Sequence, residues 1–441
     1  MRVIKHQGWG RTNKTESKCY ALEEFNSDIT ISTSNGLPIG LGRSYGDSSI
    51  TSTGVYYSMD NKKNIEINTL TKTAKCEAGA TIGDLERTAI KYGLFPPTVP
   101  GTEYVTIGGA VASNVHGKSH HIAGSFGESV ISLKLATSTG EVLNLLPAGA
   151  TSKQFWATVG GMGLTGIITE ATIQLREVET AYIKSEELRA NDLTDLMNLL
   201  TEFDKKYLYT VAWIDLSNKF LGRGKVLGGN HANLNELPKK FSKNPLHLDK
   251  PKHFKFPNIF FVNMINNFTV SIFNRIWFRK PLKNGICTAR SFFHPLDSLA
   301  GWNRLYGSKG LIQYQFQVSF ENQFFLHHAL VCLKKAKISS FLGVLKILGK
   351  ADESLLGFAS PGWTLTFDVS ANSRNIHTLL KQFNQELSQL GGKVYLTKDS
   401  SLEEHFFDLM YPAKNEWKNV KMKLDPLNYW QSDQGKRLGL C

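Results

Sequence analysis

Cysteines are few in this sequence, and long apolar runs do not occur. Its five cysteines are widely spaced along 441 residues, and no CxxC pair is present. This spacing argues against a disulfide framework and against a zinc site. No stretch of about 18 uninterrupted apolar residues occurs, so we expect no transmembrane helix. Residues 1–11 lack an apolar core, so we also expect no signal peptide. A cytoplasmic or peripheral membrane protein is the expectation.

Acidic residues are scarce relative to basic ones. The chain has 38 Asp and Glu against 51 Lys and Arg, a formal net charge of +13. Such an excess indicates an anionic partner, which could be nucleic acid, a phosphorylated substrate or an anionic membrane surface. No recognised nucleic-acid module occurs, so we expect no nucleic acid partner.

Most of the excess charge lies in residues 218–290, where 14 Lys and Arg accompany only Glu236 and Asp249. The same stretch contains two aromatic segments, 254–262 and 272–278. One interpretation is a buried hairpin or helix beside a solvated basic loop. The other is an interfacial segment that docks on anionic lipid.

The length predicts two or three domains. The pattern of predicted helices and strands changes twice along the chain. Residues 1–178 carry short β-branched runs at 29–32, 65–67, 129–135 and 166–175, with a helix start at Thr81, where Asp84 completes a capping box. Residues 179–391 alternate a helical run at 193–203 with strands at 208–214, 313–320 and 363–369. We expect two α+β domains, with residues 392–441 returning to the first.

Two glycine-rich motifs are candidates for binding a dinucleotide cofactor. Residues 40–47 read GLGRSYGD, and dense glycines let backbone N–H groups turn towards an anion such as a pyrophosphate. The spacing GxGxxxG is one residue too long for the Rossmann fingerprint, and a poor helix sequence follows. Residues 161–166 match GxGxxG as a string, but a strand-like segment follows where the fingerprint needs a helix. We therefore reject a nicotinamide site.

A second segment, residues 100–121, combines small residues with three histidines. Small residues at 106–114 permit close backbone approach to a flat ligand. His116, His120 and His121 have no carboxylate or cysteine at ligand spacing, so we expect no metal.

Together these stretches resemble the vanillyl-alcohol-oxidase type of FAD-binding oxidoreductases, which carry a PCMH-type FAD-binding domain. Within that type, the resemblance is to members that act on polyprenyl-phosphate-linked pentoses. The motifs that carry it are GLGRSYGD at 40–47, PGT at 100–102, HGKSHH at 116–121, FWATVGGMGLTG at 155–166, QYQF at 313–316 and YLTKDS at 395–400, followed by Asp425-Pro426, Ser432-Asp433 and Arg437-Leu438. The resemblance spans the whole chain.

The resemblance implies an α+β fold, in which a two-subdomain FAD-binding domain is joined by an α+β substrate-capping domain. It implies FAD bound by Pro38, Ile39, Gly40, Leu41, Gly42, Arg43, Ser44, Tyr45, Gly46, Asp47, Ser48, Pro100, Gly101, Thr102, Thr106, Ile107, Gly108, Gly109, Ser113, Asn114, Val115, His116, Gly117, Ile168 and Tyr395. Some members of the type attach FAD through a His in the first glycine loop. Because Arg43 stands there, we expect non-covalent FAD.

The resemblance also implies substrate contacts and an activity. The substrate-binding residues would be Tyr45, Lys118, Gln313, Gln315, Thr364, Thr366 and Lys398. A Lys beside the flavin can orient a hydroxyl, offset negative charge or act as a base, and Lys398 and His116 are both candidates for the catalytic group. Gln313 and Gln315 alternate on a strand and would share one face.

The expected reaction is oxidation of a ring secondary hydroxyl of a polyprenyl-phosphate-linked pentose to a keto sugar. This would be the first half of a 2'-epimerisation in cell-wall biosynthesis, completed by a separate NAD(P)-dependent short-chain reductase, with an anionic membrane surface as a further partner. Two alternatives remain: an alditol or aldonolactone oxidase that uses oxygen, and a basic binding protein that keeps a flavin fold without turnover.

Three positions depart from the family pattern. Thr364 and Thr366 stand where Asn and Cys are usual, and Phe293 stands where Tyr is common. Nitroaromatic inhibitors of the family target that Cys, so we expect them not to react covalently here.

Overall fold

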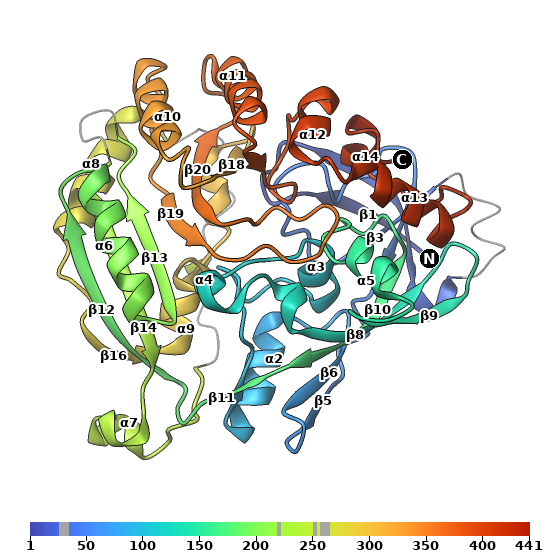
Figure 1. The fold of residues 1–441 in the computed structure, drawn as a ribbon, viewed down its shortest axis with the longest axis horizontal. Coiled ribbons are helices and arrows are strands. Elements are labelled where there is room, and N and C mark those ends of the chain that lie inside the picture. Colours follow the sequence, from blue (N-terminus) through green and yellow to red (C-terminus); the bar gives the residue numbers. More distant parts are fainter. Residues whose placement is uncertain (26–34, 218–221, 250–253, 256–264) are drawn as a thin grey trace.

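The structure is a computed structural model that describes residues 1–25, 35–217, 222–249, 254–255 and 265–441. The predicted strand at 29–32 and most of the aromatic segment at 254–262 lie outside these residues. The N-terminal part contains two small sheets (Figure 1). The first has the order β1 (Arg2–Gln7), β2 (Lys14–Ala21), β4 (Val55–Ser58) and β3 (Gly36–Ile39), and the second has the order β5 (Ile65–Asn68), β6 (Thr73–Glu77), β10 (Ile167–Gln174), β8 (Val130–Ala136) and β9 (Val142–Leu145).

This part also contains the short helices α2 (Ile82–Ala89), α3 (Ile107–Ala112), α4 (His120–Ala123) and α5 (Ser152–Thr158), of which α2, α3 and α5 pack on the second sheet. The predicted helix start is confirmed, because Thr81 Oγ1 accepts from the Asp84 N–H at 3.1 Å and the Asp84 carboxylate accepts from the Thr81 N–H at 3.0 Å. This reciprocal pair satisfies backbone donors that the first turn leaves free. The predicted strands at 65–67, 129–135 and 166–175 are also confirmed as β5, β8 and β10.

A single eight-stranded sheet dominates the middle of the chain. Its order is β16 (Gly285–Thr288), β12 (Tyr182–Ala190), β14 (Gly224–His231), β13 (Tyr209–Ile214), β19 (Gly343–Leu348), β20 (Gly362–Ser370), β18 (Leu311–Val318) and β21 (Lys393–Val394). Helix α6 (Leu193–Lys206) packs on β13 and β14, and α10 (Phe324–Lys335) and α11 (Ile376–Gln389) lie at the β18–β20 end (Figure 1). The helix at 193–203 and the three strands predicted here are confirmed.

The other face of this sheet meets the N-terminal part. Helix α4 contacts β19, and the Gly349 N–H donates to His120 Nδ1 at 3.0 Å. Smaller elements complete this region: β7 (Leu94–Phe95) with β11 (Arg176–Glu177), β15 (Phe254–Lys255) with β17 (Leu299–Ala300), α7 (Lys239–Ser242), α8 (Asn267–Arg279) and α9 (Ala289–Phe293).

The chain end forms α12 (Glu404–Met410), α13 (Lys414–Leu424) and α14 (Asp433–Arg437), which lie beside the N-terminal strands in Figure 1. Trp417 Nε1 on α13 donates to the Ala157 carbonyl on α5 at 2.8 Å. Trp430 forms a bridge with Gly36 on β3. The rings of Tyr429 and Trp430 lie 6.4 and 5.5 Å from the Tyr57 ring on β4, so aromatic side chains also join the last segment to the first sheet. In the described ranges, no helix is both long and apolar enough to cross a membrane.

Candidate active site

The first glycine loop follows directly after β3, and Gly42 turns it with φ of +63°. Among the residues that the structure describes, none accepts a hydrogen bond from the backbone N–H groups of Gly42, Arg43 or Ser44. The Arg43 guanidinium lies over the rings of Trp9 and Tyr104, at 4.4 and 5.1 Å, and its Nε is buried without a hydrogen-bond partner in the described chain. Burial lowers the pKa of Arg43. Consecutive free N–H groups beside a cation fit a pyrophosphate.

The same loop is fixed by the chain end. The Asp47 carboxylate accepts from Arg437 Nε and Nη2 at 2.9 and 2.7 Å, and Arg437 Nη2 also donates to Asp399 at 2.8 Å. A Cβ at Gly46 would lie 1.8 Å from the Asp399 carbonyl oxygen, so only glycine fits there. The carboxylate of Asp47 therefore shapes the loop, which is a structural role beside its predicted place in the cofactor site.

The second segment offers a flat surface of small residues. The Ile107 and Gly108 N–H groups donate to Ala80 and Ala78 carbonyls at 2.7 and 2.9 Å, and Gly109 N–H donates to Thr106 Oγ1 at 3.2 Å. A Cβ at Gly108 would lie 3.1 Å from the Ala78 Cβ. Since these N–H groups are engaged, the segment can contact a flavin through its surface rather than through its amides.

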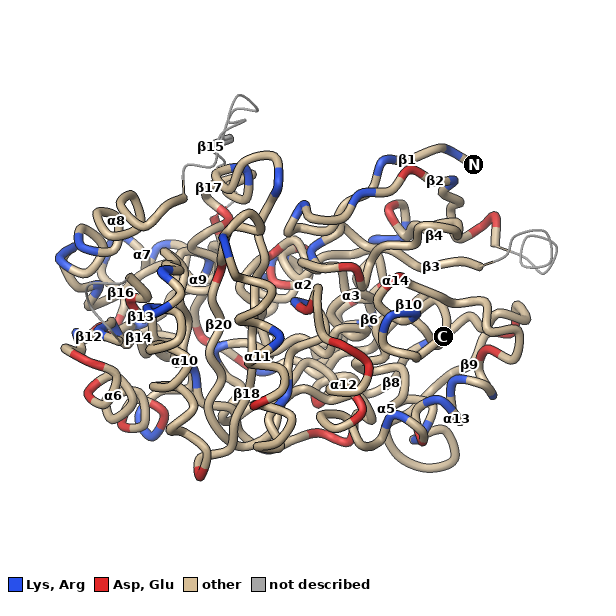
Figure 2. The backbone as a smooth tube through the Cα atoms, turned by 90° about the horizontal axis from the view of Figure 1, so that it is seen from above, with Lys and Arg blue, Asp and Glu red and all other residues tan. Residues whose placement is uncertain are grey.

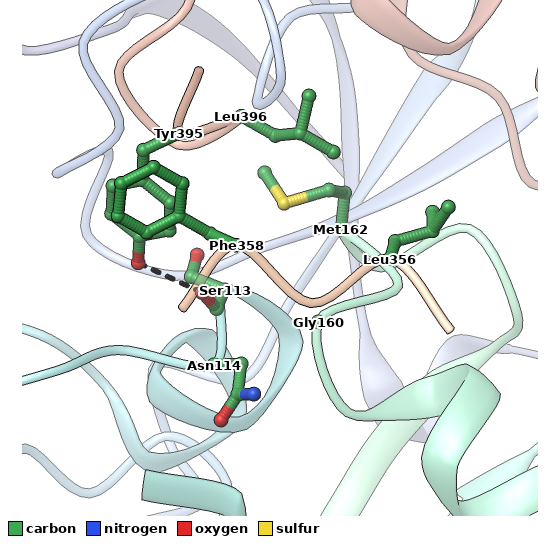
Figure 3. A pocket seen from close by; sticks show the side chains of 8 residues that line it. All are labelled: Ser113, Asn114, Gly160, Met162, Leu356, Phe358, Tyr395 and Leu396. Atoms are coloured by element: carbon green, nitrogen blue, oxygen red, sulfur yellow. Dashed lines mark hydrogen bonds between the residues drawn. The ribbon is translucent and has the colours of Figure 1, made fainter. Parts of the chain in front are cut away.

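A small pocket gathers residues from several of the predicted motifs (Figure 3). Tyr395 donates its hydroxyl to the Ser113 carbonyl at 2.8 Å, and its ring lies 4.9 Å from Phe358 and 5.3 Å from His116. The full lining is Ser113, Asn114, Gly160, Met162, Leu356, Phe358, Tyr395 and Leu396. The structure thus brings Ser113, Asn114 and Tyr395 together, and adds Met162 of the rejected GxGxxG motif.

His116 is held by two side chains of the eight-stranded sheet. Its Nε2 lies 3.0 Å from Gln315 Nε2, and its Nδ1 lies 2.8 Å from Lys346 Nζ. Burial, then the charges of Lys346 and Lys398, hold the pKa of His116 well below its usual value. With Nε2 accepting from the Gln315 amide, Nδ1 carries the proton of the neutral ring. Burial also lowers the pKa of Lys346 strongly, and a neutral amine there can accept that proton in a hydrogen bond.

The charges of Lys346 and Lys398 act on this imidazole, and the charge of Lys118 acts on Lys346. Burial lowers the pKa of Lys398 to about 8, against the opposing effect of Asp368, and lowers the pKa of Lys118 to about 8. Lys118 Nζ donates to the Phe293 carbonyl at 3.1 Å, and Lys346 Nζ donates to the Gly117 carbonyl at 3.3 Å. Within the described residues, Lys398 Nζ has no hydrogen-bond acceptor. Its amine is therefore available to a ligand.

Strand register brings the remaining groups into one patch. Gln313 pairs with Asp368, Gln315 with Thr366, and Thr364 with Lys346, across β18, β20 and β19. Paired residues point to the same face of a sheet. Gln313 Nε2 donates to Asp368 at 2.5 Å, and burial raises the pKa of Asp368 to about 7. Burial also raises the pKa of Tyr45, and the charge of the Asp368 carboxylate raises it further.

Two residues of this patch, Lys346 and Asp368, were not among the predicted site residues. Lys346 is the only charged residue in the strand sequence Gly343–Leu348, and Asp368 is the only charged residue in Gly362–Ser370; these are the signals that sequence reasoning could have used. By contrast, His120 is structural, because it bridges Ser125 Oγ and the Gly349 N–H, at 3.1 and 3.0 Å. Burial lowers the pKa of His120 to about 3, which keeps the ring neutral.

Comparisons with known proteins agree with this geometry. The FAD binding domain family matches residues 32–146. Decaprenylphosphoryl-β-D-ribose oxidase of Mycolicibacterium smegmatis is 36% identical over 98% of this chain and 97% of its own length. An uncharacterised protein of Streptomyces coelicolor is 30% identical over 82% of this chain and its own full length, and a D-lactate dehydrogenase of Archaeoglobus fulgidus is 28% identical over 42% of this chain and 44% of its own. The expected α+β fold, FAD and oxidoreductase activity are confirmed, and the chain is an FAD-dependent oxidoreductase that belongs to the decaprenylphosphoryl-β-D-ribose oxidase group of the vanillyl-alcohol-oxidase type.

Proposed function

We propose that this protein oxidises a ring secondary hydroxyl of a polyprenyl-phosphate-linked pentose to a keto sugar. The observation that carries the proposal is the free amine of Lys398 in a patch of buried lysines, amides and one imidazole. Similarity to an oxidase named for decaprenylphosphoryl-ribose, over nearly the whole of both chains, supports the same substrate class.

The chemistry divides between the cofactor and this patch. When bound, FAD accepts the hydride of the carbon that is oxidised. The hydroxyl proton needs a base, and Lys398, with a pKa of about 8, is partly neutral near pH 7 and can take it. The charges of Lys398 and Lys118 both act on Lys346, and these amines can donate hydrogen bonds to negative charge that develops on the sugar oxygen. Gln313 and Gln315 can orient the neighbouring hydroxyl groups.

We also propose a role for each domain of the chain. Residues 1–178 with 392–441 would form the FAD-binding unit, and residues 179–391 would cap the substrate. The non-covalent attachment of FAD follows from Arg43, which has no nucleophile to offer the flavin. A separate NAD(P)-dependent short-chain reductase would reduce the keto sugar and complete a 2'-epimerisation. An anionic membrane surface would present the lipid-linked substrate.

The decisive experiment is anaerobic mixing of the purified yellow protein with polyprenyl-phosphoryl ribose. We expect the oxidised-flavin absorbance to fall after mixing with the lipid-linked ribose. It should not fall after mixing with the polyprenyl phosphate alone. Persistent absorbance with the lipid-linked sugar would reject this substrate. Peroxide release in air with free alditols or aldonolactones, and no response to the lipid, would identify the oxygen-using alternative instead.

A further inference from the structure

Helix α8 (Asn267–Arg279) is held on the protein by hydrogen bonds at three places along its length. Its buried residues are Val270 and Asn274. Asn274 Nδ2 donates to Asp215 Oδ1 at 2.7 Å and to the Ser340 carbonyl at 3.1 Å. At the N-terminal end, Asn267 Nδ2 donates to the Lys337 carbonyl at 2.8 Å. These bonds fix which face of the helix points inward.

The C-terminal end of α8 is fixed in the same way. Arg189 donates to the carbonyls of Phe278, Arg279 and Lys280, at 2.8, 3.2 and 2.9 Å. Lys225 Nζ donates to the Lys280 carbonyl at 2.9 Å. With both ends and the middle tied by hydrogen bonds, the helix cannot rotate about its axis to bury a different face.

The outward face of α8 is apolar. Phe268, Ile272 and Ile276 are exposed to 74%, 45% and 65%, and their spacing of four residues places them on one stripe. At about 100° per residue, this stripe lies opposite Val270 and Asn274. An ordinary surface helix buries its apolar stripe, so a helix held in the reverse orientation indicates a partner for the stripe.

The charges around the stripe identify the kind of partner. Arg275, Arg279, Lys280 and Lys283 are all exposed, and none of them forms an ion pair within the described part of the chain. No acidic residue occurs between Asp249 and Asp297. Lys and Arg mark the end of α8 at the edge of the molecule in Figure 2. An apolar stripe with a basic rim matches the interface of an anionic bilayer, where apolar groups enter the headgroup region and cations meet phosphates.

The helix is also connected to the active-site strands. Phe273 on α8 lies 5.6 Å from the Phe341 ring, which lies 5.9 Å from the Tyr306 ring. Ser340, which anchors Asn274 through its carbonyl, accepts from the Asp368 N–H through its hydroxyl at 3.2 Å. A surface bound through α8 would therefore lie next to the strand that carries Asp368.

We propose that the outward face of α8 docks this protein on an anionic lipid bilayer. The stripe of Phe268, Ile272 and Ile276 enters the headgroup region, and Arg275 and Arg279 contact lipid phosphates. This names the part of the chain that meets the membrane. It stands on the geometry of α8 and does not depend on the identity of the sugar.

The test is flotation of the FAD-loaded full chain with vesicles of phosphatidylcholine and phosphatidylglycerol. We expect binding at low salt, and little binding to phosphatidylcholine alone. F268N/I276N should lower the partition coefficient about a hundredfold, because two large apolar side chains no longer leave water. R275E/R279E should lower it at least about thirtyfold. Both variants should keep their flavin and their melting temperature, since all four side chains are exposed.

Matched controls change the same residue types elsewhere. L70N/L427N replaces side chains that are 92% and 58% exposed, and K63E/K423E makes the same change of net charge at exposed lysines. These variants should bind vesicles as the unchanged protein does. The proposal is overturned if the unchanged protein does not float with anionic vesicles, or if the controls lose as much binding as the α8 variants. It is also overturned if the α8 variants only convert a dimer to a monomer in size-exclusion chromatography, because a second copy would then cover the stripe. Flavin reduction by the lipid-linked sugar is scored separately, so failure of the proposed substrate does not affect this outcome.

Discussion

Two buried groups of charges lie at the ends of the site and differ in how they are balanced. At the glycine loop, Arg437 is shared between Asp47 and Asp399, and every one of these charges has an opposite charge within 3 Å. In the other group, burial lowers the pKa of Lys118, Lys346 and Lys398. In the described part of the chain, Glu86 partly opposes this effect at Lys118 and Asp368 partly opposes it at Lys398.

The difference separates structure from chemistry. A buried ion pair with matched partners fixes a conformation, even though burial raises the pKa of Asp47. Burial lowers the pKa of the lysines in the other group, and at Lys346 the charges of Lys398 and Lys118 add to this effect, which leaves amines that can exchange protons. The glycine loop therefore needs its ion pairs to hold its shape, whereas the lysines gain reactivity from burial that nearby carboxylates offset only in part.

The largest expected effect is on catalysis, from Lys398→Met. The substitution keeps the length of the side chain and removes the free amine, so the rate of flavin reduction by the substrate should fall about a thousandfold. Stopped-flow measurement under anaerobic conditions checks this. The matched control is Lys393→Met, because Lys393 is also largely buried but donates to the Gly357 carbonyl at 2.7 Å. If both variants reduce flavin equally fast, Lys398 is not the base.

Next in size is the loss of stability from Arg437→Gln. The change leaves Asp47 and Asp399 as buried carboxylates without their cation, so the free energy of unfolding should fall by about 3 kcal/mol. Chemical denaturation of the FAD-loaded protein measures it. Lys153→Gln, which removes an exposed ion pair with Glu416, should change stability by less than about 0.5 kcal/mol. Equal losses in the two variants would contradict the assignment of Arg437 as a structural anchor.

The same contrast explains what sequence alone could predict. The helix at Thr81, the strands, and the glycine loop follow from local patterns: a capping box, alternation and clustered glycines. Lys346 and Asp368 could not be placed in this way, because each is a single charge in an apolar strand. Only the register of β18, β20 and β19, set by long-range pairing, brings them beside Gln313, Gln315 and Thr364. The orientation of α8 could not be predicted from the sequence for a related reason: Asn274 fixes it through hydrogen-bond partners that lie 59 and 66 residues away along the chain.

A smaller effect is expected in the pH dependence of stability. Lys118 and Lys398 have pKa values of about 8 in the folded protein, below the ordinary 10.5. Above pH 8 the unfolded chain therefore binds more protons than the folded one, and these lysines make stability rise with pH. Below pH 8 these lysines are protonated in both the folded and the unfolded chain, so their contribution to stability does not change with pH.

Buried cysteines with raised pKa values, such as Cys76 at about 12, act in the opposite direction above about pH 9. The contribution of the two lysines is therefore measured by comparing the unchanged protein with a variant that lacks both amines. The unfolding free energy of the unchanged protein minus that of K118M/K398M should increase between about pH 8 and 9.5, by at most about 1.4 kcal/mol per pH unit for each lysine. A difference that stays constant over this range would show that both amines keep ordinary pKa values.

The smallest effect is expected from Thr364→Val, which tests whether the patch positions the substrate separately from its chemistry. Thr364 Oγ1 donates to the Phe316 carbonyl at 2.8 Å and accepts from Gln315 Nε2 at 2.9 Å. Valine keeps the shape and removes both bonds, so the Gln315 amide loses one of the two contacts that orient it. Losing one such bond corresponds to about 1 kcal/mol, so KM should rise about fivefold while kcat is retained. A fall in kcat with unchanged KM would instead mean that Gln315 acts through His116 on the reacting atoms, and the division between a positioning amide and a reactive amine would fail.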